Sequence, residues 1–173
     1  GTDNADSIEA WGTSNRAYAV SDQDSANEIR AKGGDDIIYG YGGGDRINGG
    51  TGNDYIDGGD NGEDPEYGFI MKDEAIYEGS ARNYTIETFV VGTDDTALDS
   101  LISKNFGTSL DTIKAGWAPN EKIVVVADEL PASMGGTGVD ILRNVEFVSF
   151  QDKFVALSVE EFIETDGSGL PIR

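Results

Sequence analysis

The chain has 173 residues and a formal net charge of −21, with 33 acidic residues against 12 basic ones. This charge argues against binding to nucleic acid or to anionic membranes, because both need a positive protein surface. The chain has neither cysteine nor histidine, which excludes disulfides and argues against thiolate or imidazole metal sites and nucleophile–histidine catalysis. No apolar run reaches about 18 residues, so we expect no membrane-spanning helix. Because the chain starts at Gly1 without an initiator Met, we expect a longer parent protein.

The first thirty residues follow a nine-residue template only in part. Residues 1–9 (GTDNADSIE) fit it loosely, and residues 10–21 do not fit it. Residues 22–30 (DQDSANEIR) resume the phase, with Asn27 at position six and Ile29 at position eight. Their turn has no glycine, so we expect a degenerate first coil or an N-terminal cap, because terminal repeats are atypical.

Residues 31–57 contain three consecutive nine-residue units, AKGGDDIIY, GYGGGDRIN and GGTGNDYID. Positions one to four of the units are rich in glycine, which reaches positive φ at little steric cost and lets carbonyl groups crowd together. Position six is Asp36, Asp45 and Asp54, and position eight is Ile38, Ile47 and Ile56. The pattern predicts a tight turn, a carboxylate and a very short strand in each unit, with the isoleucine buried by stacking against other units.

The spacing of the aspartates predicts a cation site. Two units close one coil, so residues 18 apart lie side by side: Asp36 beside Asp54, and Asn27 beside Asp45. Two carboxylates and the turn carbonyls form an all-oxygen site, which suits calcium with its six to eight oxygen ligands. The alternative is a flexible glycine-rich linker, but a linker has no reason to hold aspartate and isoleucine in phase three times.

The remainder of the chain changes in composition. Residues 58–66 open like a repeat and lose the pattern near Pro65, which helps to end a strand series. We expect strands at residues 75–77, 84–91, 122–127, 145–150 and 154–157, and helices at residues 96–105 and 158–164. The predicted fold class is therefore all-β, with a repeat domain at residues 1–66 and a β-rich capping region at residues 67–173 that carries one or two short helices.

A lone unit, GGTGVDILR (135–143), matches the repeat template in full, nearly eighty residues after the others. It is either a glycine turn that leads into a strand without metal, or a turn whose Asp140 joins a calcium site. The first reading is favoured slightly, because the sequence shows no partner turn for it.

With these motifs in hand, the chain resembles the RTX (repeats-in-toxin, haemolysin-type) calcium-binding proteins. The segments EGSARNYTIE (78–87), IVVVAD (123–128) and GTGVDILRNVEFVSFQDK (136–153) resemble a region that often follows such repeats in secreted bacterial proteins, and residues 92–121 look like an insertion within it. The resemblance implies a right-handed parallel β-roll that folds on binding calcium. It also implies export from a bacterium through type I secretion machinery and folding outside the cell.

The resemblance further implies which groups would hold the ions, on the order of two to five of them. Each ion would lie between turns two units apart and use backbone carbonyls and the two position-six side chains. Lys32 and Tyr41 replace glycine where only a carbonyl is needed, and Asn27 lacks a charge, so its ion should be weaker. The three sets are Lys32, Gly34 and Asp36 with Gly49, Thr51 and Asp54; Gln23, Ser25 and Asn27 with Gly40, Gly42 and Asp45; and Tyr41, Gly43 and Asp45 with Gly58, Asp60 and an acidic residue near Glu63.

We therefore expect a monomeric calcium-triggered folding module of a larger secreted adhesin, toxin or exoenzyme. The alternative is a binding module for an extracellular ligand such as a polysaccharide, with Trp11, Tyr39, Tyr41 or Trp117 stacking on sugars, although core packing of these aromatics is favoured. Catalysis is not expected, because no carboxylate pair stands apart from the calcium pattern and no nucleophile motif is present.

Overall fold

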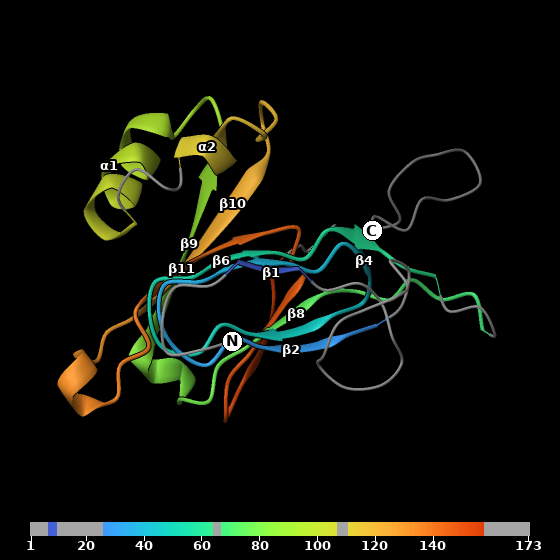
Figure 1. Ribbon diagram of the computed structural model, residues 1–173, viewed down its shortest axis with the longest axis horizontal. Helices are drawn as coiled ribbons and strands as arrows, with labels where there is room; N and C mark the ends of the chain where they lie inside the picture. Colours follow the sequence, from blue (N-terminus) through green and yellow to red (C-terminus); the bar gives the residue numbers. More distant parts are fainter. Residues whose placement is uncertain (1–6, 10–25, 64–66, 107–110, 158–173) are drawn as a thin grey trace, which may run out of the picture.

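The computed structural model describes residues 7–9, 26–63, 67–106 and 111–157, with backbone alone for residues 7–9, 111 and 112. Most of the described elements are strands, and many of them are only two or three residues long (Figure 1). They form a six-stranded sheet in the order β1-β3-β6-β11-β10-β9, a five-stranded sheet in the order β13-β12-β8-β5-β2, and a two-stranded pair. The predicted helix at residues 158–164 lies outside the described residues.

The repeat strands alternate between the two larger sheets. β2 (Glu28–Arg30) and β5 (Arg46–Asn48) pair in parallel in one sheet, and β3 (Ile37–Tyr39) and β6 (Tyr55–Asp57) pair in parallel in the other. Ile29 faces Ile47, and Ile38 faces Ile56. The chain thus crosses from sheet to sheet at every unit and returns after 18 residues, as the spacing predicts.

Strands from outside the consecutive repeats extend both parallel stacks. β1 (Ser7–Glu9) pairs with β3, β8 (Glu74–Ile76) with β5, β11 (Val139–Arg143) with β6, and β12 (Phe147–Ser149) with β8, and all four pairs are parallel. The β5–β8 register joins Ile47 to Ala75, ten residues more than one full coil. Because β11 pairs with β6, the lone unit at residues 135–143 stacks directly on the third repeat, residues 49–57. The two-stranded pair, β4 (Gly42–Gly43) and β7 (Asp60–Asn61), is parallel as well.

The C-terminal half adds an antiparallel edge to the six-stranded sheet. β9 (Tyr84–Val90) and β10 (Lys122–Asp128) form a hairpin whose second strand pairs with β11. Between them lie α1 (Asp95–Asn105) and α2 (Asp111–Lys114). β13 (Phe154–Ala156) closes the other sheet, and two 3₁₀ turns, η1 (Ala81–Asn83) and η3 (Ala132–Met134), flank the hairpin. The strands predicted in this half and the helix predicted at residues 96–105 are confirmed.

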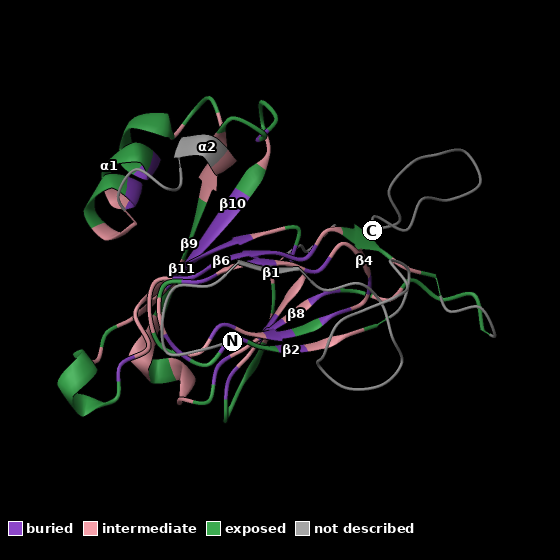
Figure 2. Ribbon diagram, viewed as in Figure 1, coloured by how far each residue is buried: buried purple, intermediate pink, exposed green. Residues whose placement is uncertain are grey.

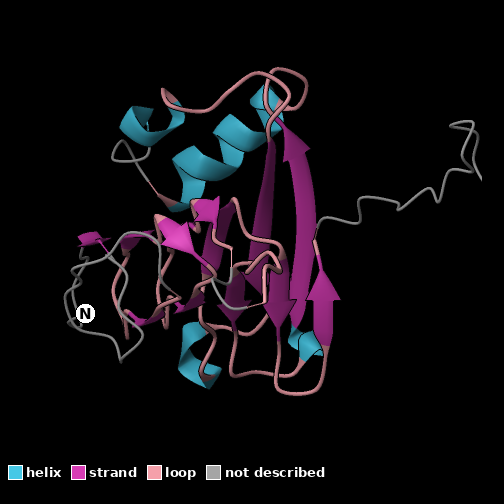
Figure 3. Cartoon of the chain, turned by 90° about the vertical axis from the view of Figure 1, so that its right-hand side faces the viewer, coloured by secondary structure: helices cyan, strands magenta, loops and turns pink. Residues whose placement is uncertain are grey.

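Two apolar cores lie on opposite faces of the six-stranded sheet, because alternate residues of β10 and β11 belong to different cores. Figure 2 shows the buried positions along these strands and on α1, and Figure 3 shows helices beside the long strands. The first fills the space between the two parallel stacks with the position-eight side chains and their successors: Ile29, Ile38, Ile47, Ile56, Ala75, Leu142 and Val148. The second lies on the outer face, where Tyr55 and Ile141 pack with Leu98 and Ile102 of α1 and with Trp117. This sheet is buried on both faces, which adds the apolar burial that a few short coils cannot supply alone.

The turns between strands place one backbone against the next. Position two has positive φ in each of the four consecutive turns from residue 31 on, at 81° for Lys32, 70° for Tyr41, 99° for Gly50 and 95° for Gly59. Lys32 and Tyr41 therefore hold a left-handed conformation that is costly for any residue with a Cβ, a constraint that the sequence argument about their carbonyls did not consider.

We predict that Gly50→Ala destabilises the fold much more than Gly92→Ala. Both glycines have similar positive φ, 99° and 88°, so both variants carry the same backbone strain. A Cβ at Gly50 would clash with the carbonyl of Lys32 in the adjacent turn, whereas a Cβ at Gly92 meets nothing within 4 Å. The clash should cost about 1–3 kcal/mol beyond the Gly92 variant, measured by urea unfolding in saturating calcium. Equal losses would contradict the close packing of the turns.

Candidate metal sites

Three position-six carboxylates, those of Asp36, Asp54 and Asp140, form a ladder beside the first residues of β3, β6 and β11 in the six-stranded sheet. The backbone N–H of Asp36 donates to Oδ1 of Asp54 over 2.9 Å, and the N–H of Asp54 donates to Oδ1 of Asp140 over 2.9 Å. All three side chains are buried, with exposed fractions of 2% or less. The lone repeat thus supplies the third rung of this first ladder.

A second ladder follows the opposite edge. The N–H of Asn27 donates to Oδ1 of Asp45 over 2.7 Å, the N–H of Asp45 donates to Oδ1 of Asp73 over 2.7 Å, and the N–H of Asp73 donates to Oε2 of Glu146 over 2.9 Å. Asp45 and Asp73 are fully buried. The two ladders therefore share one design, in which each carboxylate is fixed by the backbone of the turn stacked on it.

The second oxygen of three buried carboxylates lacks a hydrogen-bond partner, and this observation points to a cation. Oδ2 of Asp45, Asp54 and Asp73 is buried and has no hydrogen-bond partner among the described residues. An unpaired buried acceptor costs about 1–3 kcal/mol, and more when it is charged. Each of these oxygens lies beside the first glycine of its own turn, at Gly40, Gly49 and Gly58, where a side chain would fill the space.

Burial also changes the proton affinity of these groups. It raises the pKa of Asp45 to about 7, that of Asp54 to about 7 and that of Asp73 to about 8, from an ordinary 3.8. The pKa of Asp140 is raised well above its ordinary value, mainly by burial and then by the neighbouring Asp54. Near neutral pH a bound cation would therefore compete with protons for the same carboxylates.

Carboxylates alone do not make up a coordination shell here. Among the described residues, no three or more acidic side chains lie close enough together to hold a metal ion. The rest must come from backbone carbonyls, which calcium accepts readily. Such carbonyls lie at the contacts between turns: Thr51 N–H donates to the Lys32 carbonyl over 2.9 Å, and Gly52 N–H to the Thr137 carbonyl over 2.7 Å. A carbonyl has two lone pairs, so each keeps one acceptor position. The donor set of the first ladder thus fits calcium.

The structure brings together most of the residues that the sequence predicts as ligands. Lys32, Gly34 and Asp36 lie in the turn stacked on Gly49, Thr51 and Asp54, with Gly34 N–H donating to the Thr51 carbonyl over 2.8 Å. Tyr41 and Gly43 stack on the strand containing Asp60, whose N–H donates to the Tyr41 carbonyl over 2.5 Å. Asn27 lies beside Asp45, which belongs to the same unit as Gly40 and Gly42, two units further along the chain. Gln23 and Ser25 lie outside the described residues.

Sequence reasoning missed Asp73 and Glu146 as rungs of the second ladder. The carboxylate that lies beside Asp45 is Asp73, which a ten-residue insertion separates from the opening glycine of its turn. The signal available was the local motif of an acidic residue followed two positions later by an apolar one, as in Asp73–Ala75 and Glu146–Val148. The partner turn that the sequence does not reveal for Asp140 is the turn at residues 49–54.

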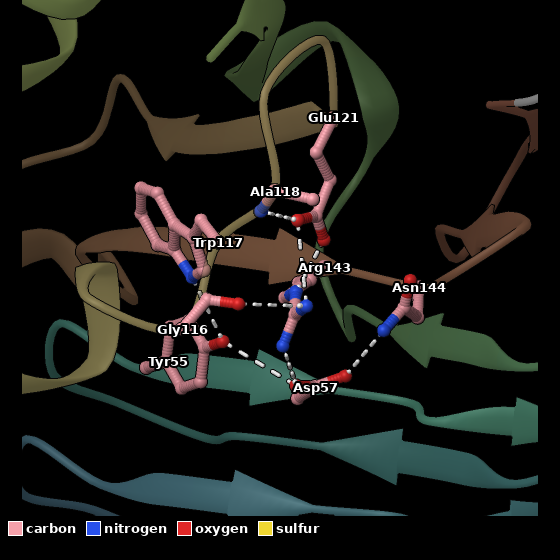
Figure 4. Close-up of polar contacts among 8 residues, drawn as sticks. All are labelled: Tyr55, Asp57, Gly116, Trp117, Ala118, Glu121, Arg143 and Asn144. Atoms are coloured by element: carbon pink, nitrogen blue, oxygen red, sulfur yellow. Dashed lines mark hydrogen bonds and ion pairs between the residues drawn. The ribbon is translucent and has the colours of Figure 1, made fainter. Parts of the chain in front are cut away.

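A polar cluster connects β6 and the end of β11 to the helical insertion between β9 and β10 (Figure 4). Arg143 of β11 donates to Oδ2 of Asp57 over 3.0 Å and pairs with Glu121, which precedes β10. Asn144 donates to the other oxygen of Asp57 over 2.9 Å. Nearby, the Trp117 Nε1 donates to the Tyr55 hydroxyl over 3.3 Å. The insertion is therefore held by the same strands that carry the first ladder.

The aromatic side chains considered for sugar stacking pack against other aromatic rings. Trp117 is only 8% exposed and stacks on Tyr55, with ring centroids 6.3 Å apart. Tyr39 packs between Tyr41 and Tyr55, at centroid distances of 6.2 and 6.1 Å. Core packing of Trp117 is thus confirmed, and Trp11 lies outside the described residues.

Comparison with known families assigns the repeats. The family of the RTX calcium-binding nonapeptide repeat (4 copies) matches residues 23–56 and 39–61. No curated protein and no solved structure matches the chain. Residues 23–61 are RTX calcium-binding nonapeptide repeats, a calcium-binding and not a catalytic family, and such repeats are typical of type I secreted bacterial proteins. Among the described residues, no helix is long and apolar enough to cross a membrane.

We predict that calcium binding strengthens as the pH rises through about 7 to 8. In chelator, the raised pKa values of Asp45 and Asp73 mean that these groups favour the fold below about pH 4, and that this contribution is lost as pH rises through their folded pKa values. Calcium requires the ionised forms, so its affinity changes in the opposite direction. Calcium titrations by calorimetry from about pH 6 to about pH 9 should show a falling dissociation constant; a pH-independent constant would contradict the buried-carboxylate assignment.

Proposed function

We propose that the chain is a calcium-triggered folding module of a larger secreted bacterial protein, built as a right-handed parallel β-roll. The single observation that carries this proposal is the pair of buried carboxylate ladders, whose unpaired oxygens lie at glycine turns. Such a stack of charges is costly until a cation neutralises it. The family match at residues 23–61 supports calcium as that cation.

The mechanism is neutralisation of charge between stacked turns. In the ionised state, Asp36 and Asp54 repel each other across one coil and oppose its closure. One calcium ion between the two turns would join both carboxylates to the carbonyls of Lys32, Gly34, Gly49 and Thr51. Each bound ion fixes a turn on which the next can stack, so that the coils propagate in order. We assign further ions to the Asn27–Asp45 and Asp45–Asp73 steps, and we propose that the first is weaker because Asn27 carries no charge.

We also assign a calcium ion to the Asp54–Asp140 step. The N–H of Asp54 bonds to Asp140, and Gly52 N–H bonds to the Thr137 carbonyl, which reproduces the contacts between Asp36 and Asp54. This ion would tie the C-terminal region, residues 67–173, to the β-roll domain of residues 1–66. Folding of the β-roll and docking of its cap would then depend on the same cation.

The proposed setting is outside the bacterial cell. Calcium is scarce in the cytosol and plentiful outside, so a chain that folds only with calcium could pass a type I secretion channel unfolded and fold on arrival. A chain free of cysteine has no disulfide to form in transit. We propose that the module acts as a monomer and supports the export and stability of its parent, whether adhesin, toxin or exoenzyme.

The test is far-UV circular dichroism in chelator, then with calcium titrated to millimolar concentration and magnesium as control. We expect a cooperative gain of β signal with calcium alone. Asp36→Ala with Asp54→Ala should sharply reduce this gain, because the central site loses both carboxylates. The outcome that sinks the proposal is a chain already folded in chelator and unmoved by calcium.

A matched pair separates loss of calcium from loss of folding. Asp36→Asn with Asp54→Asn keeps the side-chain shape and one acceptor oxygen on each residue but removes the charges. This variant should be at least as ordered as the parent chain in chelator and should respond weakly to calcium. The same calcium response as the parent chain would contradict the assignment of these carboxylates.

The Asp54–Asp140 ion can be followed through Trp117. In a Trp11→Phe background, Trp117 is the sole tryptophan, and its emission reports the docking of the insertion on Tyr55. Asp140→Asn should raise the calcium concentration needed for the emission change by about tenfold or more, because one carboxylate ligand is lost. Glu87→Gln, an exposed acid on β9, is the control and should leave the midpoint unchanged. An unshifted midpoint in the Asp140 variant would place the ion elsewhere.

A further inference from the structure

A cavity of about 410 Å³ lies between the turns of the first ladder and the cap. One wall comes from Lys32, Thr51 and Thr137, in the three turns that carry Asp36, Asp54 and Asp140. The opposite wall comes from the segment after β8 and from the end of β10, with Asn83 and Asp128. Its volume is within the range of small-molecule sites, roughly 300–1,000 Å³.

The lining is balanced in charge, unlike the chain as a whole. Its charged side chains are two cations, Arg30 and Lys32, and two anions, Glu78 and Asp128, in a chain of net charge −21. Arg30 is itself paired with Glu28 at 2.6 Å. A charged ligand would therefore find no net attraction in the cavity, and an anionic ligand would be repelled by the rest of the molecule.

The lining is rich in neutral hydrogen-bonding groups. The amides of Asn48 and Asn83 and the hydroxyls of Thr51 and Thr137 are donors and acceptors together. The Thr137 hydroxyl already donates to Asp128 over 3.2 Å and keeps its acceptor capacity. An apolar ligand would displace water from these polar groups without replacing its hydrogen bonds, which costs affinity. Tyr84 adds an aromatic side chain to the lining, and an aromatic side chain is suited to contact the apolar face of a polar ligand.

The wall groups are held in place before any ligand arrives. The carboxylate of Asp128 accepts the N–H of Leu130 over 2.9 Å and that of Thr137 over 2.8 Å. The Tyr84 ring packs on Phe150 and Tyr77, with centroids 4.9 and 5.2 Å away. Lys32 keeps a φ of 81°, close to the 99° of Gly50 in the turn stacked on it. Fixed walls reduce the entropy lost on binding.

We propose that this cavity binds a neutral saccharide, one or two sugar units of an extracellular polysaccharide. A sugar unit offers many hydroxyl groups, no charge and an apolar face, which matches each feature of the lining. The inference rests on the proposed calcium function, because the wall at Thr137 exists only when the lone repeat docks on the turn at residues 49–54. By linkage, calcium strengthens saccharide binding and the saccharide strengthens calcium binding by the same factor.

The test uses ¹H–¹⁵N NMR spectra of the whole chain in calcium. The neutral probes are maltose, cellobiose, lactose and di-N-acetylchitobiose, and glucuronate is the anionic probe. We expect at least one neutral disaccharide to give saturable shifts that centre on the amides of Asn48, Thr51, Asn83 and Thr137, with glucuronate giving none.

Asn83→Ala should weaken that binding roughly three- to tenfold, the effect of one neutral hydrogen bond. Its backbone carbonyl still accepts the N–H of Glu129, so the fold should persist, as the calcium spectrum will show. Gln151→Ala, an exposed amide side chain outside the cavity lining, is the control and should bind as the parent chain does.

The outcomes separate the two proposals. A calcium-dependent spectrum with no saturable shift for any neutral disaccharide overturns the saccharide site and leaves the calcium function intact. Stronger shifts with glucuronate than with every neutral probe overturn the neutral class of ligand. A spectrum that is well dispersed in chelator and unchanged by calcium overturns the calcium function, and saccharide binding in that state overturns the proposed linkage.

Discussion

The structure depends on burying a carboxylate at each turn of a narrow coil. A buried aspartate is tolerated when its charge is neutralised and its oxygens are paired. The turns supply half of this, since one oxygen of each side chain accepts the backbone N–H of the turn stacked on it. The other oxygen of Asp45, Asp54 and Asp73 is unpaired among the described residues. In the fold we propose, calcium neutralises the charge and contacts this second oxygen. The stability of the coil would then depend directly on how much calcium is bound.

The same constraint explains how the stack ends. A parallel stack with an open edge exposes unpaired backbone groups, and an open carboxylate ladder exposes unpaired charge. The lone repeat meets both needs, because β11 pairs with β6 while Asp140 pairs with the backbone of Asp54. β10 then continues the sheet in the antiparallel sense. The cap is thus continuous with the stack, which supports a common dependence on calcium for both.

The repeat period was sufficient to predict the part of the fold that local sequence determines. It placed Ile38 against Ile56 and Asp36 beside Asp54, because a strict period of nine leaves only one register for each stacked pair. It could not place Asp73, since an insertion hides the turn, or Asp140, since its docking is a contact across 86 residues. Nor did it reveal the left-handed backbone of Lys32 and Tyr41, which no side-chain property of these residues favours.

The two ladders differ in a way that suggests an order of folding. The first consists of three aspartates, and its turns are joined by backbone hydrogen bonds in which the Thr51 N–H donates to the Lys32 carbonyl and the Gly52 N–H donates to the Thr137 carbonyl. The second begins with the uncharged Asn27 and ends with Glu146, whose longer side chain reaches the backbone from a turn without glycine. Two full carboxylates bind calcium more strongly than one carboxylate and an amide. In the fold we propose, the Asn27–Asp45 step should therefore fill after the steps that join two carboxylates, and this end of the second ladder would close on a backbone already in register.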